Sequence, residues 1–170
     1  MDAFENIITR RSIRKFIDKP VDDQMTGKIL EAAMYAPSAR NTQAWSFVVI
    51  NNRELLDKLS VIHPYAQMLK KAPLAILVCG DKNLEKNEAY LSINCSAATQ
   101  NILLCAHSLG LGSVWLGVYP RNERMEPIAN LLNLPADNMP VSLIAIGWPD
   151  EQPPHPERFF KGKIHYNDIW

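Results

Sequence analysis

The sequence shows no excess of charge of either sign, because 18 Lys and Arg residues balance 18 Asp and Glu residues. Nucleic acids and anionic membrane surfaces attract proteins largely through surplus positive charge, so we expect neither among the partners of this chain. No apolar stretch reaches the length of about 20 residues that a membrane-spanning helix needs. The N-terminal segment also lacks the apolar core of a secretory signal. Together these absences favour a cytoplasmic protein.

Cysteine is scarce, with three residues and no Cys-x-x-Cys pair. Neither a disulfide framework nor a zinc cluster fits this pattern, so we expect Cys79, Cys95 and Cys105 to be buried, reduced thiols. The Gly-x-Ser-x-Gly, P-loop and His-Glu-x-x-His motifs are missing as well. Their absence argues against a hydrolase elbow, a nucleoside-triphosphate site and a zinc protease. The four histidines are scattered, and we expect no metal site.

The chain of 170 residues, 47% of them hydrophobic, is large enough for one core that buries about 70% of the surface of its unfolded form. Apolar runs between turn residues predict buried strands, and apolar positions three and four apart predict helices. Strands are expected at 45–50, 74–79, 113–118 and 141–146, and helices at 3–9, between Asp22 and Pro37, and at 54–59, 65–70, 86–109 and 123–132. Strands this apolar need helices on both faces, which indicates an α+β or α/β layered domain of undetermined strand order.

The C-terminal segment differs in character from the rest of the chain. Four prolines follow Trp148, so this segment cannot continue as a helix, and it ends in the apolar stretch 164–170. An isolated arm with an apolar tip is unstable in water, and we expect it to dock on another subunit. We therefore divide the chain into a body at 1–149 and a docking arm at 150–170 that belongs to the same domain.

The densest chemical signal is the run Arg10-Arg11-Ser12-Ile13-Arg14. In an extended segment Arg10, Ser12 and Arg14 share one face, because side chains alternate. Two guanidinium groups and a hydroxyl on that face suit a phosphate or another delocalised anion. A solvated basic turn, in which cations complement the C-terminal end of a helix dipole, explains the same run without a ligand.

Two further segments carry polar groups at strand ends. In the loop 37–45, Ser38, Asn41 and Gln43 offer donors and acceptors that suit a heterocycle with amide edges, although such side chains also cap their own backbone. The run 110–117 contains three glycines but lies between a helix and a following strand. The dinucleotide-binding fingerprint has the opposite order, so a Rossmann site is excluded.

Taken together, these segments resemble the nitroreductase family of flavin mononucleotide (FMN) enzymes. The resemblance covers nearly the whole chain and rests on several pieces in one order: Arg-Arg-Ser-Ile-Arg-Lys-Phe at 10–16, Ala-Pro-Ser-Ala-Arg-Asn-Thr-Gln-Ala-Trp at 36–45, Ala-Pro at 72–73, Ala-Ala-Thr-Gln-Asn-Ile-Leu-Leu at 97–104, Gly-Leu-Gly-Ser-Val-Trp-Leu-Gly at 110–117 and Ile-Gly-Trp-Pro at 146–149. It implies an α+β homodimer with a central, mostly antiparallel or mixed sheet, an exchanged C-terminal arm and two interfacial FMN sites.

The resemblance also implies roles for individual residues. The phosphate and ribityl chain of FMN would be held by Arg10, Ser12 and Arg158, with Arg11 nearby, and Arg14 would lie at the pyrimidine edge of the ring. The segment of the other chain that walls the ring would supply Pro37, Ser38, Ala39, Asn41 and Gln43. Backbone N–H groups of Leu116 and Gly117 would face N5 and O4.

The implied activity is ping-pong hydride transfer from NAD(P)H, through flavin N5, to a flat acceptor such as a nitroaromatic or a quinone. No side chain needs to act as an acid or a base, because the flavin carries the chemistry. Alternatives on the same scaffold are flavin fragmentation, dehalogenation of iodotyrosine and azoline oxidation. A flavin-binding dimer without catalysis is a further alternative. Asn94 and Ala44 depart from the acidic residue and the proline common in relatives, which leaves the dimer contacts near the long helix open.

Overall fold

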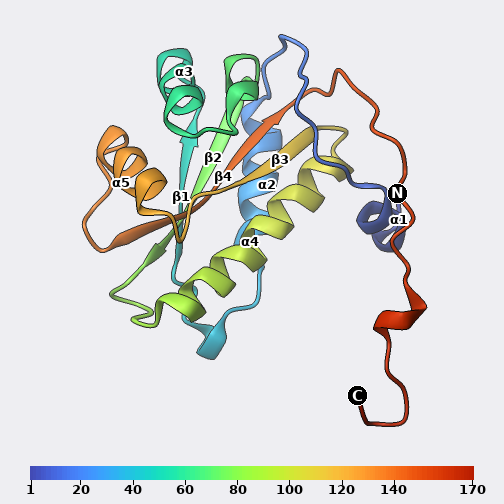
Figure 1. Ribbon diagram of the computed structural model, residues 1–170. Coiled ribbons are helices and arrows are strands. Elements are labelled where there is room, and N and C mark those ends of the chain that lie inside the picture. The colour runs from blue at the N-terminus through green and yellow to red at the C-terminus, as the bar shows by residue number, and fades with distance from the viewer.

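Four strands form one antiparallel sheet in the order β1-β2-β4-β3 in the computed structural model, which describes residues 1–170 (Figure 1). The strands are β1 (Trp45–Ile50), β2 (Leu74–Asp81), β3 (Gly112–Gly117) and β4 (Asn138–Gly147). All three strand pairs are antiparallel, so the sheet is the antiparallel alternative among those the sequence left open, and the α+β class is confirmed.

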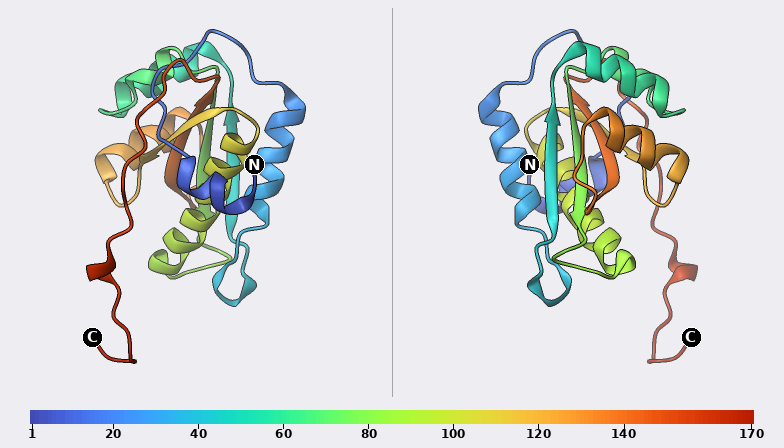
Figure 2. Two further views of the ribbon diagram at one scale, coloured as in Figure 1. Left: turned by 90° about the vertical axis from the view of Figure 1, so that its right-hand side faces the viewer. Right: turned by 90° about the vertical axis from the view of Figure 1, so that its left-hand side faces the viewer.

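Helices cover both faces of the sheet. They are α1 (Ala3–Thr9), α2 (Asp23–Met34), α3 (Arg53–Ile62), α4 (Glu88–Ser108) and α5 (Asn122–Leu131), with short 3-10 turns at Ala39–Asn41, Gln67–Lys70 and Lys161–Lys163. Figure 2 shows the sheet edge-on, with α2 and α4 on one side and α3 and α5 on the other. Two buried clusters of 18 and 17 residues correspond to these two layers, as expected for central strands that are apolar on both faces.

The ends of the helices follow from local chemistry. Asp2 and Asp22 accept hydrogen bonds from the backbone N–H groups of Glu5 and Met25, three residues into α1 and α2, as N-cap residues do. Gly110 follows α4 with φ of 78°, a left-handed conformation that a residue without Cβ adopts at little cost. These three boundaries confirm the predictions made from the sequence.

Burial of the strands differs between the centre and the edge of the sheet. Every residue of β4 except Asn138 is buried, and so is every residue of β2 except Asp81. By contrast β1 lies at an edge, and Ser46 and Val49 are exposed. The expectation that helices cover both faces of the sheet is therefore confirmed, although the cover is incomplete at the edge strand β1.

The structure can be compared with the sequence-based expectations for the cysteines and for membrane-spanning helices. All three cysteines are free, and Cys79 and Cys95 are buried, whereas Cys105 is half-buried. Burial raises the pKa of the Cys79 and Cys95 thiols to about 12, so they stay protonated and unreactive at neutral pH. None of the helices combines the length and the hydropathy needed to span a bilayer.

The C-terminal arm leaves the body of the protein. In both figures it runs away from the sheet beyond α1, and every residue from 157 to 170 is exposed. Its tip turns back through Asn167 and Asp168, both in the left-handed region, so that the rings of His165 and Trp170 stack 4.1 Å apart. The division into a body and a docking arm remains a prediction, and Trp170, 98% exposed, has no cover within its own chain.

Candidate functional site

The basic run lies along the free side of β3. Ser12 and Ser113 form a parallel bridge, and the Ile13 amide donates to the Ser113 carbonyl at 3.0 Å. Gly112 permits this approach, since a Cβ there would lie 2.7 Å from Cγ2 of Ile13. The segment is therefore extended, with Ile13 buried and Arg14 exposed, and successive side chains take opposite sides as expected.

The first residues of the C-terminal arm form hydrogen bonds with the basic run and Lys15. The Glu151 carboxylate accepts hydrogen bonds from the amides of Arg14 and Lys15, and the Asp150 amide donates to the Lys15 carbonyl at 2.9 Å. Arg11 donates through Nε to the Pro154 carbonyl at 3.3 Å. These contacts direct the rest of the arm past Arg10.

The arm brings the positive charge of Arg158 near those of Arg10 and Arg11. Burial, together with the neighbouring charges of Arg158 and Arg11, lowers the pKa of Arg10 below its ordinary value. Residues 148 positions apart in sequence therefore share one positive site, and none of the three arginines forms an ion pair with a carboxylate. Unbalanced positive charge at a partly buried site is unfavourable unless an anion neutralises it.

Arg11 uses its guanidinium differently from the other two arginines. Its Nη1 donates to the carbonyls of Ile8 and Arg10 at 2.8 and 2.7 Å, in addition to the bond from Nε to the arm. These acceptors include the end of α1, where cations are favoured. Arg11 therefore holds the backbone in place, whereas the guanidinium groups of Arg10 and Arg158 form no ion pair.

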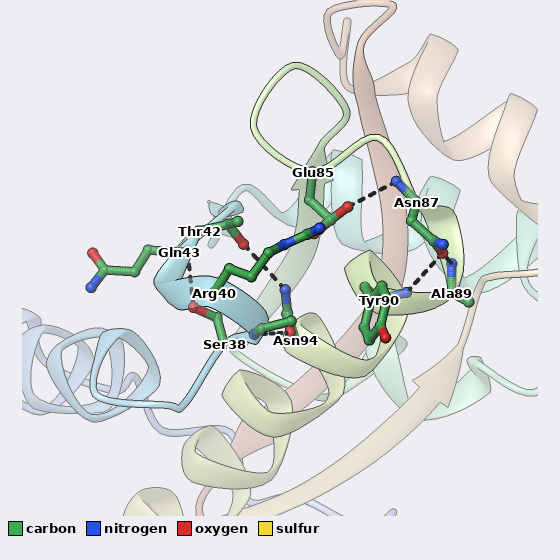
Figure 3. Close-up of polar contacts among 10 residues, drawn as sticks. Ser38, Arg40, Thr42, Gln43, Glu85, Asn87, Ala89, Tyr90 and Asn94 are labelled. Atoms are coloured by element: carbon green, nitrogen blue, oxygen red, sulfur yellow. Dashed lines mark hydrogen bonds and ion pairs between the residues drawn. The ribbon is translucent and has the colours of Figure 1, made fainter.

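The loop 37–43 lies at the opposite end of the molecule. Figure 3 shows how it is fixed: the Ala39 amide donates to Oδ1 of Asn94 at 3.0 Å, and Nδ2 of Asn94 donates to Oγ1 of Thr42 at 3.4 Å. Asn94 belongs to the first half of α4, and it is 2% exposed. An amide can donate to the loop and accept from it, which a carboxylate cannot.

The loop is strained. Arg40, Asn41 and Gln43 have φ values of 53°, 54° and 47°, and such left-handed backbone costs non-glycine residues about 1–3 kcal/mol each. Internal bonds offset part of this cost, since the Gln43 amide donates to Oγ of Ser38 and Nε2 of Gln43 donates to Oδ1 of Asn41. Pro37, Asn41 and Gln43 are exposed, and Ser38 and Ala39 are half-exposed, so the loop presents amide groups on the surface.

A buried carboxylate braces the same loop. Glu85, which precedes α4, is 2% exposed; it accepts from Nη2 of Arg40 at 2.5 Å and from the Asn87 amide at 2.9 Å (Figure 3). The hydrogen bonds from Asn87 and Arg40 lower the pKa of Glu85 below its ordinary value. The Arg40 guanidinium is therefore committed to Glu85, although the other face of the side chain is exposed.

Glu85 should make the protein sensitive to acid. Because its pKa is lowered in the folded state, its stabilising contribution is present above the ordinary value of 4.5 and is lost as the pH falls through the folded-state value. As the pH is lowered below about 4.5, we expect the free energy of unfolding to decrease less steeply in Glu85→Gln than in the wild type. Chemical denaturation across this range measures the slope, and the exposed Glu126→Gln is the control. Equal slopes for wild type and Glu85→Gln would contradict the bracing role.

A pocket of about 270 Å³ opens at the C-terminal end of β3. Arg14, Leu116 and Gly117 line it together; their role at the flavin ring stays a prediction. Four further residues line it, none of them predicted at the flavin site: His63, Tyr65, Trp115 and Arg124. Trp115 belongs to the run 110–117, whereas the other three come from segments without a common motif. Two arginines line this pocket and no carboxylate does.

The two halves of the predicted site do not meet within one chain. Asn94 contacts the loop 37–43, whereas Nε2 of His107, on the same helix, lies 3.0 Å from Oγ1 of Thr9 beside the basic run. Thirteen residues of helix separate these contacts by about 20 Å. In Figure 1 the two regions accordingly lie at different ends of α4. A single chain therefore carries two half-sites.

The chain is thus a layered α+β domain with guanidinium groups at one end of α4 and amides at the other, and it can be compared with known proteins on this basis. The model of the Nitroreductase family matches residues 7–62 and 61–148. The chain belongs to this family.

Individual relatives agree with that assignment. A Methanothermobacter thermautotrophicus protein, provisionally named NADH dehydrogenase/NAD(P)H nitroreductase, is 49% identical over 97% of this chain and 86% of its own length. The crystal structure of a similarly named Bacteroides thetaiotaomicron protein is 40% identical, with a TM-score of 0.93 over 98% of both chains. An FMN-dependent nitroreductase of Clostridium difficile is 34% identical, with a TM-score of 0.90 over 98% of this chain and 99% of its own.

Proposed function

We propose that this chain is a homodimeric, FMN-dependent oxidoreductase that passes hydride from NAD(P)H to a flat acceptor such as a nitroaromatic or a quinone. The observation that carries the proposal is the separation of the two half-sites at opposite ends of α4. A two-fold axis near the middle of this helix places the N-terminal end of one copy beside the C-terminal end of the other. Each dimer then contains two complete sites.

The surface of α4 supports this arrangement. Tyr90 and Ile93 are 47% and 61% exposed, although the opposite stripe of the helix is fully buried in the core. On α1, Phe4 and Ile7 are also exposed, at 72% and 56%. Large apolar side chains exposed on two helices that contact each other mark an interface, and a second copy of the chain is the occupant that completes the site.

The residues present fit FMN. Its phosphate carries about −1.5 to −2 charges at neutral pH, which Arg10 and Arg158 balance, and Ser12 adds a hydroxyl on the same segment. Arg14 and Gly117 line the pocket at the other end of this segment, where the ring lies, and the partner's loop 37–43 walls it with Pro37, Ser38, Ala39, Asn41 and Gln43. Bound FMN supplies N5, the atom that accepts and donates hydride, so the protein needs no acid or base of its own.

The register of β3 selects which backbone amide faces the ring. The Val118 amide donates to the Val141 carbonyl of β4 at 3.1 Å, whereas the Ser113 carbonyl faces outward to Ile13. Because hydrogen-bonded and open positions alternate in an antiparallel pair, Leu116 faces β4 and Gly117 faces the open edge. We assign the N–H that contacts the flavin to Gly117, with Leu116 packing beneath the ring.

If each site is shared between two subunits, mixing two inactive variants should restore part of the activity. The double variant Arg10→Ala/Arg158→Ala damages one half-site, and Ser38→Ala/Asn41→Ala damages the other. In a heterodimer one site carries both lesions and the other carries none, so random reassociation of equal amounts restores about a quarter of the wild-type sites. The measurement is NAD(P)H-dependent bleaching of the yellow flavin before and after subunits are exchanged.

The outcomes of this experiment distinguish the alternatives. Recovery towards a quarter of the wild-type signal supports a site built from both subunits. No recovery after exchange, verified with a tagged copy, would contradict it. A wild-type protein that takes up no FMN would reject the proposed function altogether, and one that binds FMN without reduction by nicotinamide would favour a binding protein.

A further inference from the structure

The carbonyl of Gly117 receives two side-chain hydrogen bonds. Nε2 of His63 lies 2.9 Å from this oxygen and Nη1 of Arg124 lies 2.8 Å from it. In a strand the N–H and the C=O of one residue point to the same edge. The Gly117 N–H, which we propose faces the flavin, and the Gly117 carbonyl, which His63 and Arg124 hold, therefore point to the same edge of β3.

His63 is held in one protonation form. It is 1% exposed, and its Nδ1 accepts a hydrogen bond from the Tyr65 amide at 3.2 Å. Since Nδ1 accepts, Nε2 carries the proton that is donated to Gly117. Burial lowers the pKa of His63, and the positive charge of Arg124 lowers it further, although the bond to Gly117 opposes both effects. His63 is therefore a neutral donor with a fixed direction.

Arg124 retains unused binding capacity. Its Nε is buried and has no hydrogen-bond partner, and its guanidinium forms no ion pair with a carboxylate. The guanidinium lies 5.5 Å from the centre of the Tyr65 ring and lines the pocket that also contains Arg14. A buried donor without an acceptor is costly, and here it lies beside an open pocket.

We propose that Arg124 is part of the flavin site, where it places positive charge at the N5–O4 edge of the ring, and that His63 is a positioning residue that holds Gly117 for the same contact. This inference rests on the proposed function. Reduction by hydride adds two electrons and one proton to the ring and oxidises NAD(P)H to NAD(P)⁺, so the ring gains negative charge. A guanidinium beside it stabilises the reduced form relative to the oxidised form.

The decisive experiment compares Arg124→Gln, which can still donate to Gly117, with Arg124→Lys, which keeps the charge. Arg121→Gln, at the start of the same helix and paired with Glu123, is the matched control. We expect the ratio of affinities for reduced and oxidised FMN to fall about tenfold in Arg124→Gln, which corresponds to about 30 mV in the midpoint potential of a two-electron couple. Arg124→Lys and the control should stay near the wild type.

A second measurement uses the protein without FMN. Titration of His63 by NMR should show its pKa higher in Arg124→Gln than in the wild type, because one neighbouring positive charge is gone, and unchanged in Arg121→Gln.

The positioning role of His63 is tested by FMN binding. His63→Phe should weaken FMN binding several-fold, and His63→Gln, which restores an N–H donor, should recover it.

Each result decides one question. A midpoint potential that is unchanged in Arg124→Gln overturns the inference, as does an equal loss in Arg124→Lys, since charge would then not be the cause. Equal FMN affinity in His63→Phe and the wild type removes the positioning role. Failure of the wild-type protein to bind FMN would instead reject the proposed function, so the two failures are distinguishable.

Discussion

Replacing Arg10 and Arg158 together by alanine should weaken FMN binding by at least about 100-fold. Each charge-assisted hydrogen bond to a phosphate contributes about 1.5–3 kcal/mol, and two are lost. The double variant should not lower the stability of the protein without FMN. It removes the repulsion between positive charges that, together with burial, lowers the pKa of Arg10. We therefore expect opposite signs: a melting temperature without FMN that is equal or higher, and a smaller increase on adding FMN.

Riboflavin, which lacks the phosphate, provides the internal control for this prediction. Its affinity, followed by quenching of flavin fluorescence, should be the same for the double variant and the wild type. Lys58→Ala with Arg121→Ala removes two cations that pair with carboxylates elsewhere, and FMN affinity should not change. A loss of FMN affinity smaller than about tenfold, or an equal loss for riboflavin, would mean that the phosphate lies elsewhere.

Removing the tip of the C-terminal arm should dissociate the proposed dimer. A chain that ends at residue 163 keeps Arg158 but loses Ile164, Tyr166, Ile169 and Trp170, which are 37%, 73%, 77% and 98% exposed. Full burial of one large apolar side chain contributes about 1.5–3 kcal/mol, and a dimer buries two arms. We expect the dimer dissociation constant to rise about 100-fold or more, as measured by analytical ultracentrifugation.

Two controls separate docking of the arm from other effects. Val61→Ala removes an equally exposed apolar side chain from α3 and should leave the dimer intact. A shorter chain that ends at residue 149 should lose the dimer and, without Arg158, FMN affinity as well. Undiminished dimerisation of the chain ending at residue 163 would show that the tip does not dock on the other subunit.

Much of the secondary structure could be predicted because its causes are local. The run 45–50 is a strand in the structure with the predicted bounds, and Asp2 and Asp22 cap their helices through bonds that span three residues. The other strands deviate by one to three residues at their ends, as in β4, predicted at 141–146 and observed at Asn138–Gly147. Strand ends depend on the neighbouring strand, which local sequence does not specify.

The candidate site was predictable only in part. Arg10, Ser12 and Arg14 lie on one extended segment, so their common face follows from alternation alone. Glu85, Glu151, His63 and Arg124 carry no motif. Glu85 pairs with the side chain of Arg40, 45 residues away, and Glu151 accepts from the Arg14 amide, 137 residues away. His63 and Arg124 reach the Gly117 carbonyl from 54 and 7 residues away. Such contacts exist only after the chain has folded.

The sequence by itself determined the helices, the strands and the types of side chain available, because propensity, capping and periodicity act over a few residues. Tertiary structure decided the strand order, the meeting of Arg10 with Arg158 and the separation of the loop 37–43 from the basic run. The physical reason is the rigid length of α4, which holds two groups of residues about 20 Å apart. A helix cannot bend its own ends together, which is why the site that we propose takes its second half from another copy of the chain.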